Sequence, residues 1–112
     1  MKMNEENSLL LKLTGDVPFF KIIDFLLENK GMDFSKSDIA KGAELSRASL
    51  FKYWGEIEQH QIVKVTRSFG KTKLYTLNVK NPVTQKLIEL ERVLIAESMD
   101  KALSKKEVII EN

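Results

Sequence analysis

The chain has no cysteine and only one histidine, His60, among its 112 residues. Without cysteine it cannot form disulfides, use a catalytic thiolate or hold a cysteine-ligated zinc or iron–sulfur centre. A single histidine also excludes a multi-histidine metal site within one chain, so we expect no metal and no cofactor. The sequence offers neither the ~20 consecutive apolar residues of a membrane helix nor the pattern of a signal peptide. We therefore expect a cytoplasmic protein with no membrane partner.

The chain also has little excess of one charge over the other: its net charge is only +2. The distribution along the chain is uneven. Residues 47–80 contain seven basic and two acidic side chains, a net charge of +5, whereas residues 1–46 and 81–112 are mildly acidic. The mass of 12.9 kDa fits one folded domain. A basic segment inside such a domain suits a polyanionic partner.

The first part of the chain has the spacing of helices. Ser8–Thr14 is too short for periodicity to decide between a helix capped by Ser8 and a strand. A longer amphipathic helix is expected to have Asp16 as its N-cap and Pro18 in its first turn, and to end near Gly31. This second segment is the first candidate for a core helix.

Two further helices are expected to be joined by a tight turn. The first is short and is capped by Ser35 or Ser37. Glu44 and Leu45 form the turn, with Leu45 pointing toward the core. A helix over Arg47–Gln59 follows, and its apolar residues share one stripe. The stripe consists of Leu50, Trp54 and Ile57.

After His60 the apolar period changes from 3.6 residues to 2. Ile62–Arg67 and Lys73–Val79 alternate between apolar and polar side chains and are rich in β-branched residues. Ser68–Lys71 joins them, so this part predicts a β-hairpin of about six residues per arm. Phe69 at its tip either packs on the base of the hairpin or forms a wedge at a nucleic-acid groove.

A last helix is expected from Asn81, its N-cap, and Pro82, its first residue. Its apolar surface is wider than one small domain can cover, so we expect a homodimer formed through this helix, helped by residues 8–14. The residues assigned to the dimer interface are Val83, Leu87, Leu90, Leu94, Ile95 and Met99.

The order of helix, short helix, tight turn, helix, hairpin and long helix is that of a winged helix-turn-helix. The expected fold class is mainly α with a small β-hairpin (α+β): a three-helix core, a two-stranded wing and a long C-terminal dimerisation helix. The domain organisation is a flexible N-terminus (1–7), a winged helix-turn-helix DNA-binding domain (8–80), a dimerisation helix (81–104) and a tail (105–112).

The helix over residues 47–59 is about 20 Å long, which suits a DNA major groove about 12 Å wide. Recognition helices contact bases through their N-terminal residues, and Arg47 has the geometry to pair with a guanine edge. The basic wing, residues 67–73, suits the DNA backbone or the minor groove. The residues predicted to bind DNA are Ser46, which also caps the helix, Arg47, Ala48, Ser49, Phe51, Lys52, Tyr53, Arg67, Lys71 and Lys73.

Six segments carry a family resemblance: Leu13–Pro18, Asp38–Ala40, Leu45–Leu50, Arg67–Tyr75, Leu77-Asn78 and Asn81-Pro82. Together they resemble a group of small archaeal winged helix-turn-helix proteins, similar in plan to MarR and ArsR repressors, over about residues 8–95. The resemblance implies a DNA-binding transcription regulator that is commonly a homodimer. Trp54 stands where leucine is usual and Gly55 where a polar residue is usual. The Cys and His sets of ArsR-type metal sensors are absent.

These features favour one of three functions. A sequence-specific, double-stranded DNA-binding transcription regulator explains the basic wing and Arg47 together. A protein–protein interaction module without DNA binding is the alternative, because fold alone does not fix function. An enzyme is not expected, since no nucleophile motif is present and Asp24, Glu28 and Asp33 are expected to be solvated charges. No small-molecule ligand is evident.

Overall fold

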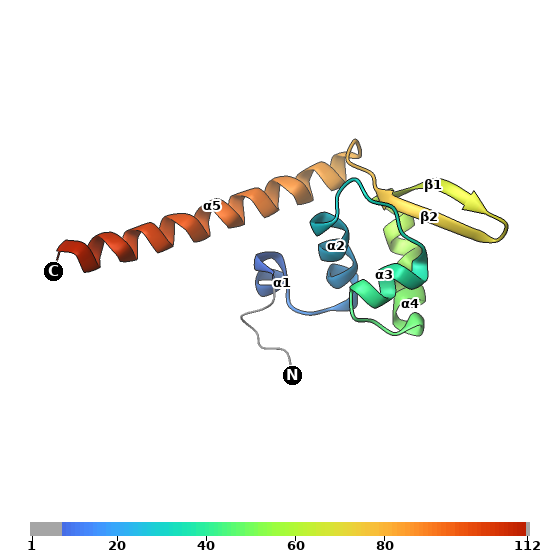
Figure 1. The fold of residues 1–112 in the computed structure, drawn as a ribbon, viewed down its shortest axis with the longest axis horizontal. Helices are drawn as coiled ribbons and strands as arrows, with labels where there is room; N and C mark the ends of the chain where they lie inside the picture. The colour runs from blue at the N-terminus through green and yellow to red at the C-terminus, as the bar shows by residue number, and fades with distance from the viewer. Residues whose placement is uncertain (1–7, 112) are drawn as a thin grey trace.

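The computed structural model of the chain describes residues 8–111, with side chains over residues 8–104. A body of helices carries a two-stranded hairpin, and the hairpin and the last helix leave this body in opposite directions (Figure 1). The α+β winged-helix architecture is the fold class that the sequence predicts. Its elements are α1 (Leu9–Thr14), α2 (Pro18–Glu28), α3 (Lys36–Gly42), α4 (Arg47–Gln59), β1 (Val63–Phe69), β2 (Thr72–Leu77) and α5 (Pro82–Glu111).

The first two helices begin at different kinds of cap. The Ser8 hydroxyl accepts a hydrogen bond from the Leu11 N–H, so residues 9–14 form a helix and not a strand. The N-cap of α2 is Val17, and the prediction of Asp16 was wrong. Pro18 occupies the first helical position, and a residue before proline prefers the extended conformation that an N-cap needs.

The helix-turn-helix is formed by α3 and α4. Ser35, not Ser37, caps α3, and its hydroxyl and the Asp38 carboxylate each accept a backbone N–H of the other residue. Glu44 turns the chain with a positive φ of 59°. The Leu45 N–H then donates to the Ala40 carbonyl at 2.8 Å. The predicted turn and one of the two predicted caps of α3, Ser35, are therefore confirmed. Helix α4 begins and ends where its sequence pattern predicts.

The core lies between α2, α3, α4 and the base of the hairpin. Trp54 of α4 is only 3% exposed, and its ring meets the ring of Tyr75 edge-on at 5.0 Å. This contact joins α4 to the wing. The buried core side chains include Ile22, Ile23, Leu26, Leu27, Ile39, Leu50, Ile57, Ile62 and Leu77.

The wing is an antiparallel hairpin with a tighter turn than expected. Ser68 and Phe69 pair with Lys73 and Thr72, so they belong to β1 and not to the turn. The register shifts at a bulge between Val65 and Arg67. The segment before α3 adds one bridge to the sheet, because Phe34 and Tyr75 exchange two backbone hydrogen bonds of 2.8 and 2.7 Å.

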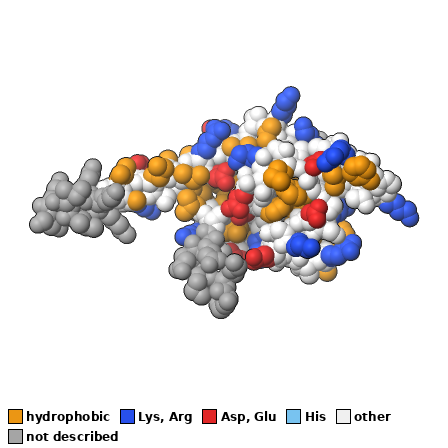
Figure 2. All heavy atoms as spheres, viewed as in Figure 1, with side chains coloured by type: hydrophobic (Ala, Val, Ile, Leu, Met, Phe, Trp, Pro, Cys, Tyr) orange, Lys and Arg blue, Asp and Glu red, His pale blue; other side chains and the backbone are white. Residues whose placement is uncertain are grey.

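The last helix, α5, has 30 residues and continues to Glu111, beyond the expected end near residue 104. No glycine or proline occurs between residues 83 and 111 to interrupt it. Leu87, Leu90 and Leu94 are half-buried against the protomer's own core. Farther along, hydrophobic side chains follow the part of α5 that extends from the body (Figure 2). None of the helices over residues 8–111 has the length and apolar composition to span a membrane.

Two carboxylates have surroundings that sequence reasoning did not foresee. Asp24 on α2 is 8% exposed. Burial raises its pKa above the ordinary value, a Ser8 hydrogen bond lowers it, and the charge of Glu91 raises it. Asp33 lies in an ion pair with Arg67. The expectation that both are simply solvated charges was therefore wrong.

Two glycines in helices have opposite surroundings and provide a paired test of the packing. A Cβ on Gly42 would overlap the ring of Phe25, which already packs against Phe34 with ring centroids 4.8 Å apart. A Cβ on Gly55 meets nothing within 4 Å. We expect Gly42→Ala to lower the free energy of unfolding by about 1–3 kcal/mol through overpacking. We expect Gly55→Ala to raise it by about 1 kcal/mol.

Denaturant unfolding followed by circular dichroism measures both changes. A Gly42→Ala protein as stable as the parent would contradict the close packing of α2 on α3.

Candidate nucleic-acid interface

A basic cleft lies between the N-termini of α3 and α4 and the wing. It has a volume of about 350 Å³. Four of its nine lining residues are cations and none is acidic, so the cleft suits an anion with several charges. The lining residues are Ser35, Lys36, Ser37, Arg47, Phe51, Lys71, Thr72, Lys73 and Tyr75.

Helix α4 presents an open strip on the side away from the core. Ser46 caps the helix by accepting the Ser49 N–H at 3.1 Å. Arg47, Ala48 and Lys52 are exposed. Because α4 turns once every 3.6 residues, Ala48 and Lys52 lie on the same face, opposite the buried stripe. The helix therefore offers one cation and one small apolar residue to a groove.

An aromatic and cationic stack forms the wall of the cleft. The ring of Phe51, which is 49% exposed, has the Lys36 ammonium 5.5 Å away and the Arg47 guanidinium 5.7 Å away. Lys36 also lies 5.7 Å from the ring of Trp54 and 5.9 Å from that of Tyr75. A cation within about 6 Å of the centre of an aromatic ring is attracted to the electrons of its face. Lys36 therefore lines the cleft within 6 Å of three aromatic ring centres.

Lys36 is absent from the residues that the sequence predicted. It belongs to α3, and it reaches the cleft only because α3 packs against α4 and β2. The one sequence signal was that Lys36 follows the helix cap Ser35, which places it at the N-terminus of the helix-turn-helix.

Not all predicted DNA-binding residues are equally available. Ser49 and Tyr53 are half-buried, and Tyr53 packs against the core. Lys52 lies over the Tyr53 ring, with its ammonium 5.6 Å from the ring centre. These two half-buried residues flank the open strip of α4, whereas the other predicted residues of the helix face solvent.

Three cations of the outer part of the wing fall into two groups. Lys71 and Lys73 line the cleft. Arg67 instead donates two hydrogen bonds of 3.2 Å to the Asp33 carboxylate. Hydrogen bonds from Arg67 and from the Thr66 hydroxyl, 2.6 Å away, lower the pKa of Asp33. The charge of Arg67 is therefore compensated within the protein.

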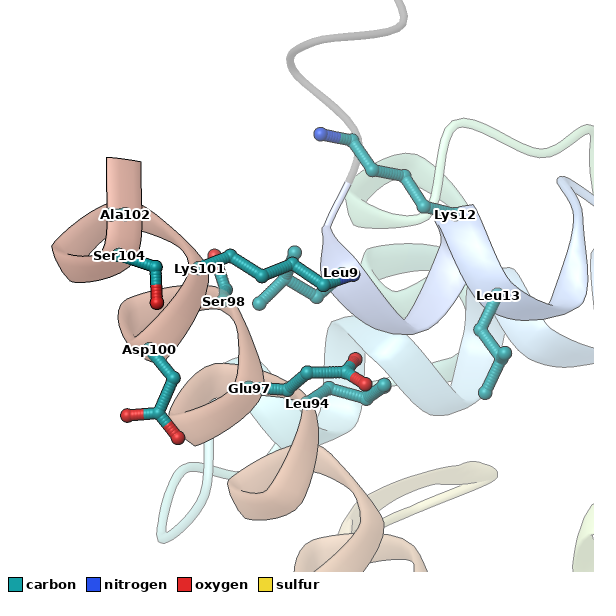
Figure 3. A pocket seen from close by; sticks show the side chains of 10 residues that line it. All are labelled: Leu9, Lys12, Leu13, Leu94, Glu97, Ser98, Asp100, Lys101, Ala102 and Ser104. Atoms are coloured by element: carbon teal, nitrogen blue, oxygen red, sulfur yellow. The ribbon is translucent and has the colours of Figure 1, made fainter. Parts of the chain in front are cut away.

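A larger groove, about 850 Å³, lies far from this interface, between α1 and the free half of α5. Leu9 of α1 and Leu94 of α5 point into the space between the helices, whereas Lys12 points away (Figure 3). Ala102 continues the same side of α5. Glu97 extends into the same space beside Leu94, so the groove combines apolar side chains with a carboxylate.

No protein-family model and no curated protein sequence matches the chain. Solved structures do match it. MepR, a transcription regulator of the Staphylococcus aureus multidrug efflux pump MepA, aligns with a TM-score of 0.61 and 14% identity over 86% of this chain and 69% of MepR. Sso10a-2, a DNA-binding protein from Sulfolobus solfataricus, aligns with a TM-score of 0.51 and 19% identity over 80% of this chain and 92% of that protein.

A third structure is the MarR family transcriptional regulator SPO1453 from Silicibacter pomeroyi. It aligns with a TM-score of 0.50 and 12% identity over 91% of this chain and 68% of that protein. These likenesses show that the chain has the winged-helix fold found in transcription regulators.

Proposed function

We propose that the chain is a sequence-specific, double-stranded DNA-binding transcription regulator. The observation that carries the proposal is the four-cation cleft between the N-terminus of α4 and the wing. A duplex with α4 in its major groove would bring a phosphate backbone to the wing side of this helix. The regulators among the structural neighbours support the same role.

The cations have three different roles in this proposal. Arg47 at the start of α4 reads a guanine edge through two hydrogen bonds. Lys36, Lys71 and Lys73 neutralise phosphates, which positions the protein without reading sequence. Ala48 offers a methyl contact to thymine. Arg67 is hydrogen-bonded to Asp33 and supports the wing.

Arg47→Ala and Lys71→Ala separate base reading from phosphate binding. We expect Arg47→Ala to cost about 1–3 kcal/mol of binding free energy and to relax base preference at one position. We expect Lys71→Ala to weaken all duplexes alike and to lower the salt slope by about one unit. Fluorescence anisotropy over a salt series, using duplexes selected from a random pool, measures both.

Wild-type protein that binds no duplex in a salt-dependent manner would contradict the proposal. That result would favour the alternative of a protein-interaction module.

We further propose that the protein acts as a homodimer formed through α5, with help from α1. Ile95, Met99 and Leu103 are exposed by 46%, 61% and 56% on the part of α5 that extends from the body. The groove between α1 and α5 continues this apolar region. A second copy covers both, and places two recognition helices about 34–36 Å apart on a pseudo-palindromic site.

A further inference from the structure

The tip of the wing carries a large apolar side chain with no place in the core. Phe69 is 58% exposed and is the last paired residue of β1, directly before the turn at Gly70. The hairpin projects from the body at this end (Figure 1). Packing on the base of the hairpin, one of the two alternatives for Phe69, is therefore excluded.

The Phe69 ring is nevertheless held in a defined place. Arg67 lies two residues earlier on the same strand, and residues two apart share one face. Its guanidinium carbon is 5.7 Å from the centre of the Phe69 ring. The same guanidinium is anchored by two hydrogen bonds to Asp33, which also accepts the Thr66 hydroxyl. The chain thus presents a supported aromatic ring to solvent.

The neighbours of the ring are suited to a nucleic-acid backbone. Lys71 follows it in the turn, and Lys73 pairs with Ser68 close to the tip, on the opposite face of the hairpin from Phe69. An apolar side chain flanked by cations has the chemistry of a minor-groove wedge, which separates a base step while nearby cations bind phosphates. A docking site for an apolar protein surface would gain little from two lysines at the same hairpin tip as the exposed ring.

We propose that Phe69 is a wedge that enters the minor groove, partly unstacks one base step and bends the duplex toward the major groove. This inference rests on the proposed function, because it requires α4 to hold the same duplex. It makes the wing a device that reads DNA deformability: steps that open easily, such as TA and CA/TG, bind better than stiff steps.

The test uses the full chain and a 30-base-pair duplex, selected from a random pool by the wild-type protein. End-labelled fluorophores report the bend by energy transfer, and 2-aminopurine at the wing contact reports unstacking. We expect Phe69→Ala to abolish both signals and to weaken binding roughly five- to hundredfold, since contacts between bases and aromatic rings are of this size. The salt slope stays unchanged, because no phosphate contact is lost.

Two variants serve as controls. Phe69→Leu keeps an apolar wedge, so it retains most of the bend. Lys71→Ala lowers the salt slope and leaves the bend intact. Thermal unfolding shows that each variant is folded, which is expected because both positions face solvent.

The outcomes separate the two proposals. If wild-type protein binds duplexes with a normal salt slope but leaves them straight, or if Phe69→Ala bends them equally, the wedge is wrong and DNA binding stands. If Phe69→Ala leaves all DNA signals unchanged but abolishes capture of a protein partner, the tip is a protein contact. If no duplex is bound at all, both proposals fail.

Discussion

Replacing Ile95 and Met99 together by aspartate is expected to turn a dimer into a monomer and to weaken binding to a two-half-site duplex about a hundredfold or more. The two side chains lie on one face of α5, four residues apart, and are 46% and 61% exposed in the protomer. Two carboxylates placed in an apolar interface between copies would be desolvated without partners. The loss of affinity follows because a monomer cannot engage both half-sites at once.

The position of α5 makes this effect large. The helix is about 45 Å long at 1.5 Å per residue. Its first half packs on the body through Leu87, Leu90 and Leu94, and the ammonium of Lys30 lies 3.4 Å from Glu91. Those contacts remain in the double variant. Sedimentation equilibrium at micromolar concentration is expected to give 12.9 kDa for the variant and twice that mass for the parent.

Val93→Asp is the matched control. Val93 is also exposed on α5, at 57%, but it lies about 160° around the helix from Ile95. It should leave the dimer and the DNA affinity unchanged. A parent protein that sediments as a monomer, or a double variant that remains dimeric, would show that this face does not join two copies.

Truncating Trp54 to alanine is expected to lower the free energy of unfolding by about 3–5 kcal/mol. That is a large share of the roughly 5–15 kcal/mol that stabilises a typical domain. Trp54 is 3% exposed, and it joins α4 to Tyr75 of the wing. Its ring also supports the Lys36 ammonium at 5.7 Å. The variant should therefore lose stability and DNA binding together.

Phe51→Ala on the same helix should weaken DNA binding and leave the stability nearly unchanged. Phe51 is 49% exposed and stacks between Lys36 and Arg47, so its loss should leave stability within about 1 kcal/mol of the parent and weaken duplex binding several-fold. Chemical denaturation paired with anisotropy titration separates the two variants. Equal stability of Trp54→Ala and the parent would mean that α4 and the wing are not joined through this ring.

Much of the fold follows from signals that act over a few residues. The Ser46 cap and the apolar stripe of α4 determine the helix over Arg47–Gln59, because both depend on contacts within one or two turns. Alternating residues on both sides of Gly70 predict the hairpin for the same reason. The local signals were weakest at the ends of helices. Helix α2 has Val17 as its N-cap because Pro18 occupies the first helical position. Helix α5 continues to Glu111 because no glycine or proline interrupts it.

The candidate site likewise has one part that local sequence determines and one part that only the tertiary structure determines. The sequence by itself determined that a helix with Arg47 and Lys52 in its first half is followed by a basic wing, since both are continuous segments. Only the tertiary structure decided which cations are free to bind. Arg67 is paired with Asp33, 34 residues away along the chain, and Lys36 reaches the cleft through the packing of α3 on α4. Such pairings depend on the path of the chain between distant segments, which local propensity and periodicity do not specify.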